Sequence, residues 1–179
     1  MVQIENQSTK REFYKSYLIL VQELFQKSEP NIIRPNIGAI RKRNLVAATV
    51  FLAFAMESFI NDFGNQFFEE FDDFEMTPTY KKYLLFPKYA SSNPFPLILS
   101  GSNKYRLLRA LFKYRDLFVH HKPKFREEES REEVMFNELN HEKLREFYSN
   151  CIKIFKLFNS QFHMFTDSDD WLTDYSENL

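Results

Sequence analysis

The segment 41–70, RKRNLVAATVFLAFAMESFINDFGNQFFEE, constrains the fold of this chain most strongly. Its middle is apolar on nearly every side of a helix, whereas a helix at a protein surface carries a single apolar stripe. Its longest apolar run, 45–56, is too short to cross a bilayer before Glu57 interrupts it, so we expect no membrane span. The segment therefore predicts a central helix surrounded by other helices.

The composition favours an all-α protein with one domain. The chain has 179 residues, of which 44% are hydrophobic and 21 are Phe, and this is enough to fill a sizeable core. Only 3 Gly leave little material for tight β-hairpins or for a Gly-rich phosphate loop. A single core is comfortable at this length, so we predict one domain over 1–179.

Two further helices are predicted on either side of the central segment. Helical spacing of apolar residues predicts a first helix over 8–27, with Ser8 as its N-cap. After the central helix, Thr77 and Pro78 are a suitable N-cap and first residue for a short helix that ends near Phe86.

The C-terminal half predicts two longer helices. Asn103 is the expected N-cap of a helix over 104–121, which Pro123 ends because the residue before a proline avoids the α region. Asn140 is the expected N-cap of the last helix. Apolar residues in this last helix recur at steps of three and four: Leu144, Phe147, Cys151, Ile154, Phe158, Phe162 and Phe165.

These segments together predict an all-α, antiparallel bundle of four to five helices. Two irregular excursions interrupt it, a Pro-rich and Ser-rich loop over 87–102 and a highly charged stretch over 124–140 with one short helical turn. The acidic tail over 166–179 is expected to fray.

Charge and cysteine content indicate a soluble, cytoplasmic protein. The formal net charge of −1 gives no global basic field, so a nucleic-acid site would have to be local. The single cysteine cannot form an intrachain disulfide, and no Cys/His cluster has the spacing of a zinc site. We therefore expect a reducing compartment, no metal and no cofactor.

The stretch LFKYRDLFVHHKP, 111–123, contains an anomaly. Arg115 lies near the centre of an apolar helical arc of roughly 140°, which is formed by Leu107, Phe118, Leu111, Leu108, Val119 and Phe112. A guanidinium stays charged when it is buried, so it needs a carboxylate, a phosphate or a protein partner. Glu57 is the only ionisable group of 45–60, and Asn61 lies one turn later on the same face. We therefore predict that Arg115 pairs with Glu57.

The same helix end carries a candidate acid and base. His120 can exchange a proton near neutral pH, and Asp116, four residues earlier, is placed to hold its ring in one tautomer. On a straight helix Arg115 and His120 point about 140° apart. They can converge only if the last turn unwinds or a second copy of the chain supplies the missing half. His121 is the second choice for the acid and base, because adjacent helical residues diverge.

Positive charge gathers around this motif. The segment 104–126 contains eight Lys or Arg residues and one acid. Arg106, Arg109 and Lys113 form a stripe opposite the apolar arc, which would suit an anionic ligand. The alternative is an ordinary solubilising face.

Residues 115–120 read as an arginine, four residues and a histidine, with a polar residue directly after the arginine. This pattern resembles the R-x4-H motif of the HEPN superfamily. The stretch AATVFLAFAMESFIND also resembles the central helix of such proteins, in which an acid interrupts an apolar run. The resemblance implies a HEPN-like helical fold and a metal-independent endoribonuclease that works as a dimer, often as a toxin or antiviral effector.

Carried over by position, the resemblance implies a role for each residue of the motif. His120 would be the acid and base, and Arg115 would stabilise the phosphorane. Asp116 would be the polar orienter, a position where Asn is commoner. The basic residues would contact RNA phosphates: Arg106, Arg109, Lys113 and Lys122. The expected partners are RNA, a second copy of the chain and an antitoxin protein.

The alternative is a non-catalytic, HEPN-like module for dimerisation or binding. In that case Arg115 and Glu57 form a structural ion pair, because buried charges are commonly paired for solvation alone. A nucleotide-binding helical domain is a third reading, which no Gly-rich loop supports.

Overall fold

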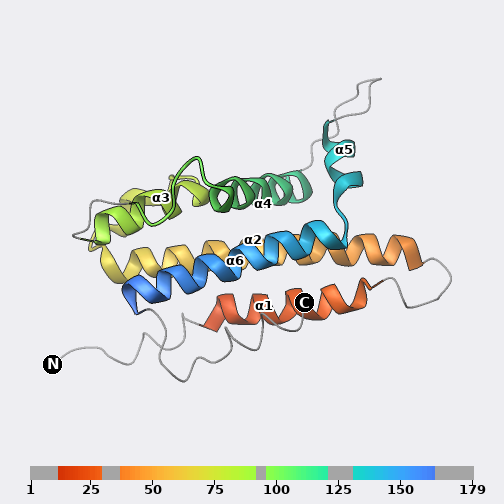
Figure 1. Cartoon of the computed structure of the whole chain (residues 1–179), viewed down its shortest axis with the longest axis horizontal. Helices are drawn as coiled ribbons and strands as arrows, with labels where there is room; N and C mark the ends of the chain where they lie inside the picture. Colours follow the sequence, from red (N-terminus) through yellow and green to blue (C-terminus); the bar gives the residue numbers. More distant parts are fainter. Residues whose placement is uncertain (1–11, 30–36, 92–95, 121–130, 164–179) are drawn as a thin grey trace.

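Helix α2 (Ile37–Phe67) forms the centre of the protein, and four of the other helices pack around it (Figure 1). The computed structural model describes residues 12–29, 37–91, 96–120 and 131–163. Besides α2 these residues form α1 (Glu12–Lys27), a 3-10 helix η1 (Phe71–Phe74), α3 (Thr79–Ala90), α4 (Asn103–Val119), α5 (Arg131–Glu138) and α6 (His141–Phe162). No strand occurs in these ranges, so the all-α prediction is confirmed.

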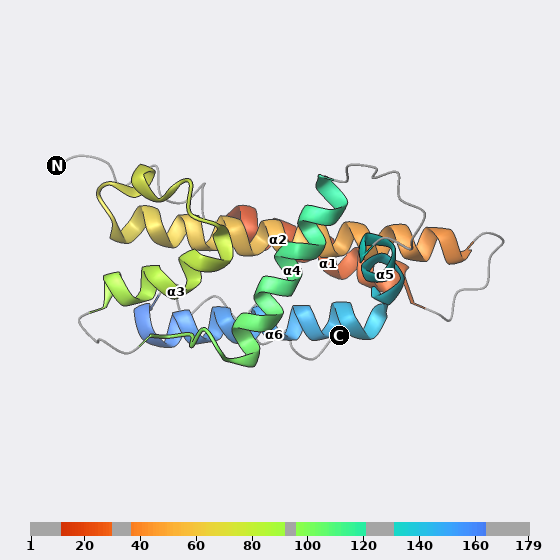
Figure 2. The same cartoon turned by 90° about the horizontal axis from the view of Figure 1, so that it is seen from above.

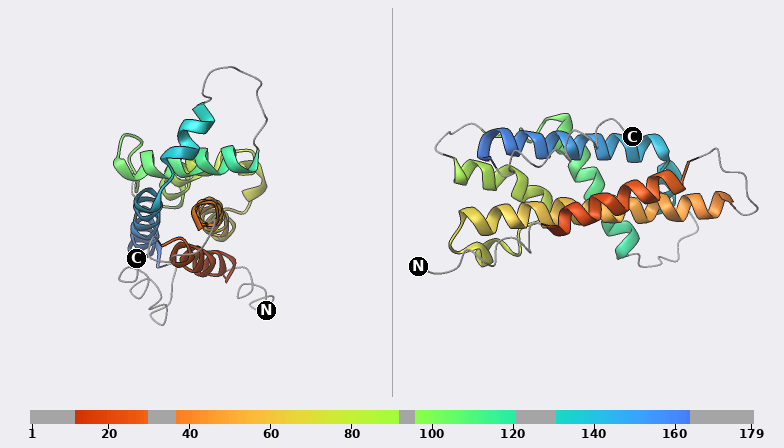
Figure 3. Two further views of the ribbon diagram at one scale, coloured as in Figure 1. Left: turned by 90° about the vertical axis from the view of Figure 1, so that its right-hand side faces the viewer. Right: turned by 90° about the horizontal axis from the view of Figure 1, so that it is seen from below.

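Aromatic contacts set the direction of α1 and α6 against α2. Tyr14 of α1 contacts Phe59, whereas Tyr17 contacts Phe51, so α1 runs antiparallel to α2 as predicted. Along α6 the order is reversed: Phe59 contacts Phe155, and Phe63 contacts Phe162, so α6 runs in the same direction as α2. The predicted antiparallel arrangement is therefore wrong for this pair of helices. The three helices lie lengthwise beside one another (Figure 3).

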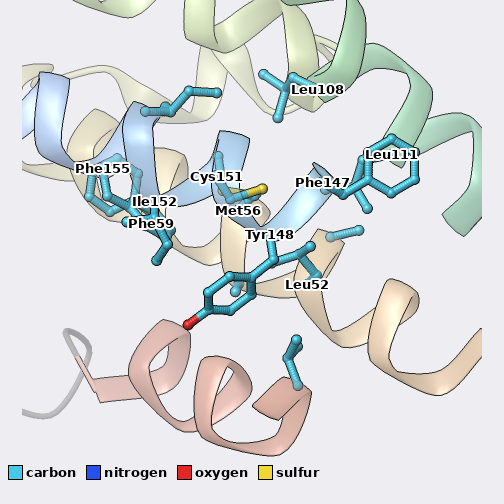
Figure 4. Close-up of a cluster of buried hydrophobic side chains, with 14 of the residues drawn as sticks. Leu52, Met56, Phe59, Leu108, Leu111, Phe147, Tyr148, Cys151, Ile152 and Phe155 are labelled. Atoms are coloured by element: carbon cyan, nitrogen blue, oxygen red, sulfur yellow. The ribbon is translucent and has the colours of Figure 1, made fainter. Parts of the chain in front are cut away.

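Helix α4 crosses over α2 and α6 at a steep angle, and its C-terminal end projects beyond α2 (Figures 2 and 3). Leu108 and Leu111 of α4 are fully buried. Leu108 faces Met56 of α2 and Cys151 of α6, whereas Leu111 lies beside Phe147 of α6 (Figure 4). The amide of Asn150 donates to the carbonyl of Lys104 at 3.0 Å and fixes the other end of the crossing. The described helices therefore share one hydrophobic core.

Helix α3 differs from its prediction at both ends. Its N-cap is Pro78, so Thr77 does not cap it, and the hydroxyl of Thr79 is used elsewhere. The helix also continues through Pro87 to Ala90, although we expected a loop from residue 87. Pro87 removes one backbone hydrogen bond, and like Phe86 it is buried in the structure.

Glycine allows η1 and α3 to approach α2 closely. A Cβ atom on Gly64 would overlap the ring of Phe71 and would lie 2.9 Å from the ring of Phe86. Helix α3 runs in the same direction as α2 here, since Thr79 contacts Glu57 while Phe86 lies beside Gly64. The absence of a side chain at Gly64 thus helps to set the position of α3.

The observed caps and bounds of α4, α5 and α6 agree only in part with those predicted. Asn140 caps α6 as predicted, because its side chain accepts the backbone N–H of Lys143 at 2.8 Å. Helix α4 is capped by Ser102 in place of Asn103 and ends at Val119. Within the charged stretch 124–140, α5 is longer than the single turn expected. The predicted Ser8 cap, Pro123 and the tail over 166–179 lie outside the described residues.

Gly38–Phe67 is long and apolar enough to cross a membrane, by length and composition alone. The prediction of no membrane span rested only on the apolar run over 45–56 and therefore did not include this longer helix. The central helix of a bundle has the same properties, because it is apolar on most sides. Here α1, α3, α4 and α6 all pack against this helix.

Candidate functional site

Arg115 and Glu57 form an ion pair between α4 and α2, which confirms the predicted pairing. Nη1 of Arg115 lies 2.7 Å from Oε2 of Glu57. The Arg115 side chain is 19% exposed and the Glu57 side chain 34%, so the pair lies at the edge of the core. The guanidinium carbon also lies 5.2 Å from the centre of the Phe112 ring.

The partial exposure of Arg115 follows from the position of α4. Leu108, Leu111 and Phe112 are buried on the predicted arc, but Val119 at its end is 46% exposed. The last turn of α4 projects beyond α2, so this part of the arc has less protein to cover it (Figure 2). The buried face also extends to Tyr114, which the predicted arc did not include.

Helix α3 contributes two side chains that the sequence analysis missed. The hydroxyl of Thr79 donates to Oε1 of Glu57 at 2.9 Å, and Nζ of Lys82 donates to Oδ1 of Asn61 at 2.9 Å. Both α3 side chains are buried. We call Glu57, Asn61, Thr79, Lys82 and Arg115 the polar junction, because they join α2, α3 and α4.

The electrostatic environment of Lys82 is unusual for a lysine. Burial lowers the pKa of its amine, and the negative charges of Glu57 and Glu75 partly oppose this shift. The amine also lies 5.1 Å from the centre of the Phe71 ring. A sequence signal for this position did exist: Lys82 is four residues before Phe86 and three after Thr79, and hence on the face of α3 that packs inward.

Asp116 does not hold the ring of His120, so this prediction is wrong. Its Oδ1 accepts from Nε of Arg115 at 2.9 Å, and Nη2 of Arg115 lies at the same distance from it. The guanidinium is thus held between Glu57 and Asp116. The reason is local: Arg115 is adjacent and long enough to fold back to Asp116, whereas His120 has left the helical conformation as the C-cap of α4.

His120 is exposed at the end of α4. Its backbone N–H donates to the carbonyl of Asp116 at 2.9 Å, so the last turn of α4 does not unwind before His120. Within the described ranges, no hydrogen bond or ion pair of its ring occurs. The second candidate histidine, His121, lies outside the described residues.

The predicted basic stripe is on the exposed face of α4. Arg106, Arg109 and Lys113 are all exposed, and the Arg109 guanidinium carbon lies 6.0 Å from the centre of the Tyr80 ring. The fourth predicted phosphate contact, Lys122, lies outside the described residues. Helix α4 thus carries exposed cations along one side and leads to His120 at its end.

Other reactive groups do not gather into a second site in the described part of the chain. No group of three or more His, Cys, Asp or Glu residues there could hold a metal ion. Cys151 is buried, and burial raises the pKa of its thiol, which keeps it in the unreactive protonated form.

The chain matches no protein-family model, no curated protein and no solved structure. Two groups at the end of α4 are suited to act on a phosphodiester. The guanidinium of Arg115 is held by two carboxylates, and the imidazole of His120 is exposed to solvent. Each terminal nitrogen of a guanidinium carries more than one N–H, so donors remain for a further acceptor.

Proposed function

We propose that this protein is a metal-independent endoribonuclease in which Arg115 and His120 act on a phosphodiester of RNA. One observation carries the proposal: α4 carries a held guanidinium and a row of exposed cations, and its C-cap carries an exposed imidazole. The R-x4-H spacing, which resembles that of HEPN ribonucleases, supports the same reading.

RNA carries its own nucleophile, so this reaction needs no metal. His120 removes the proton of the 2′-hydroxyl, whose oxygen then attacks phosphorus while the bond to the 5′-oxygen breaks. The N–H groups of Arg115 stabilise the charge on the non-bridging oxygens, and an imidazolium returns a proton to the leaving 5′-oxygen. The products end in a 2′,3′-cyclic phosphate and a 5′-hydroxyl. Asp116 acts as an orienter of Arg115, because its carboxylate holds that guanidinium.

The active unit of this proposal is a dimer. Helix α4 stays helical to Val119, so Arg115 and His120 diverge within one chain by about 140°. A two-fold interface would bring the C-terminal ends of α4 from two copies side by side. The arginine of one copy could then serve the histidine of the other.

The exposed row on α4 would hold the RNA backbone. Arg106, Arg109 and Lys113 follow one another at helical spacing and can contact successive phosphates. An RNase of this kind in the cytoplasm would be harmful without control. We therefore include a toxin or defence role, with an antitoxin protein as partner, in the proposal.

The test is an RNA cleavage assay in EDTA. Wild-type protein is expected to shorten single-stranded RNA and to leave DNA of the same sequence intact, with cyclic phosphate ends visible by mass spectrometry. Arg115→Ala is expected to abolish cleavage. Arg145→Ala, at an exposed position of α6, is the matched control and should cleave normally. Circular dichroism of each variant separates lost activity from lost folding.

A second candidate is a non-catalytic module for dimerisation or binding. It is favoured by the position of Arg115 between Glu57 and Asp116. These two carboxylates offset the positive charge of Arg115 that would otherwise attract a phosphate. Such a protein would shift RNA in a gel without shortening it. Arg115→Ala would then lower the stability of the protein and leave its RNA binding unchanged.

A further inference from the structure

The carboxylate of Glu57 is held at both of its oxygens by different helices. Thr79 of α3 donates to Oε1 at 2.9 Å, and Arg115 of α4 donates to Oε2 at 2.7 Å. A glutamate with one partner can rotate about several bonds and carry that partner with it. Because Thr79 of α3 holds Oε1 of Glu57, the direction of Oε2, which accepts from Arg115, is fixed as well.

A parallel contact lies one turn further along α2. The amine of Lys82 donates to the side-chain oxygen of Asn61 at 2.9 Å. Thr79 and Lys82 are only 7% and 4% exposed, so water cannot readily replace either donor. The two contacts bind the same face of α3 to the same face of α2, and this keeps Thr79 in register with Glu57.

The charge of Lys82 has a further effect on the junction. Arg115 is hydrogen-bonded to two carboxylates, those of Glu57 and Asp116, so these three groups together carry a net negative charge. Lys82 interacts electrostatically with Glu57, and with Glu75 nearby, so its positive charge partly offsets the negative charge of these carboxylates. A less negative cluster repels a phosphate less.

We propose that Thr79 and Lys82 are positioning residues for RNA cleavage, which hold Glu57 so that it directs the Arg115 guanidinium toward the phosphate. Neither residue touches the substrate. Both act through Glu57 and Asn61, and because they serve the same site, the proposal rests on the proposed function. Small displacements matter at such a site, since a misplacement of about 1 Å can cost about a hundredfold in rate.

The test compares substitutions that keep or remove the hydroxyl of Thr79. Thr79→Val keeps the shape of the side chain and removes the donor, so kcat for RNA cleavage in EDTA is expected to fall about tenfold to hundredfold. KM should stay within about twofold, because no RNA contact is lost. Thr79→Ser restores the donor and is expected to restore kcat.

Thr49 offers a matched control on α2. It is fully buried, and its hydroxyl donates to the carbonyl of Leu45 within the same helix, outside the polar junction. Thr49→Val removes the same group from an equally buried position and should leave kcat unchanged. Lys82→Met is the second variant, and it is expected to lower kcat even if Thr79→Val does not fold.

A second measurement does not depend on catalysis. The side-chain Nε–Hε signal of Arg115 in a nitrogen–proton NMR spectrum reports how rigidly the guanidinium is held. Thr79→Val is expected to broaden or shift this signal, whereas Thr49→Val should leave it in place. An unchanged signal in Thr79→Val would overturn the inference.

The outcomes separate the two proposals. If wild-type protein cleaves RNA and Thr79→Val cleaves it at the same rate, the inference is wrong and the ribonuclease function stands. Equal losses in Thr79→Val and Thr79→Ser would also overturn the inference, since the hydroxyl would not be the cause. If wild-type protein cleaves no RNA, the proposed function is wrong, and the Arg115 signal alone decides whether α3 orients this side chain.

Discussion

Two regions of the protein are held together by different interactions. Ring packing stabilises the aromatic core between α1, α2 and α6, whereas hydrogen bonds and an ion pair stabilise the polar junction between α2, α3 and α4. In the core, rings such as Phe59, Phe63 and Phe158 meet edge to face, and no single atom pair decides the arrangement. In the polar junction, particular oxygens and nitrogens must meet, as at Glu57 and Arg115. The core should therefore respond to lost volume, and the polar junction to a lost partner.

Removal of a central ring should have the largest effect on stability. Phe59 is 1% exposed and contacts Tyr14, Phe155 and Phe158. Phe59→Ala leaves a cavity among rings that cannot close it, so the free energy of unfolding should fall by about 3–5 kcal/mol. Urea denaturation followed by circular dichroism measures this change. Phe59→Leu should cost less, and an equal loss in both variants would show that volume is not the deciding factor.

The polar junction should show coupling between its partners. Glu57→Leu leaves Arg115 without its α2 partner, and we expect a loss of about 2 kcal/mol, less than for a fully buried pair because water reaches both side chains. The double variant Glu57→Leu/Arg115→Leu should recover part of this loss. Urea denaturation of the single and double variants forms the cycle. Strict additivity would contradict the coupling.

The smallest effect is expected in the pH dependence of stability. The pKa of Lys82 is lowered by burial, so between this lowered pKa and about 10.4 the unfolded chain binds more protons at this site than the folded one. The stability of wild-type protein should therefore rise with pH across this window, relative to Lys82→Met. Below the lowered pKa the cost of burying the charge is fully present. Parallel stability curves for the two proteins would contradict the burial of a charged amine.

The core was predictable because its signals are periodic and local. The all-round apolar character of 41–70 indicated the central position of α2, and steps of three and four indicated α6 together with its Asn140 cap. The pair of Arg115 and Glu57 was predictable for a related reason: each is a lone charge in an apolar stretch, and burial requires a partner.

The rest of the polar junction could not be predicted, because it depends on how α3 is placed. Thr79 follows a proline at a helix start, where a threonine suggests local capping, yet its hydroxyl is bound by a residue of α2. The approach of α3 depends on η1 and on the missing side chain of Gly64, which no periodic pattern shows. Asp116 was misassigned because helical spacing does not show that its neighbour Arg115 folds back to it.

The most direct test of the ribonuclease mechanism is a time course of RNA cleavage in EDTA by wild-type protein, His120→Ala and His121→Ala. His120 is the exposed C-cap of α4, so its removal should leave the fold intact and is expected to abolish cleavage. His121→Ala should retain activity. Undiminished cleavage by His120→Ala would contradict the mechanism, and loss of cleavage in His121→Ala alone would assign the acid and base to the neighbouring residue.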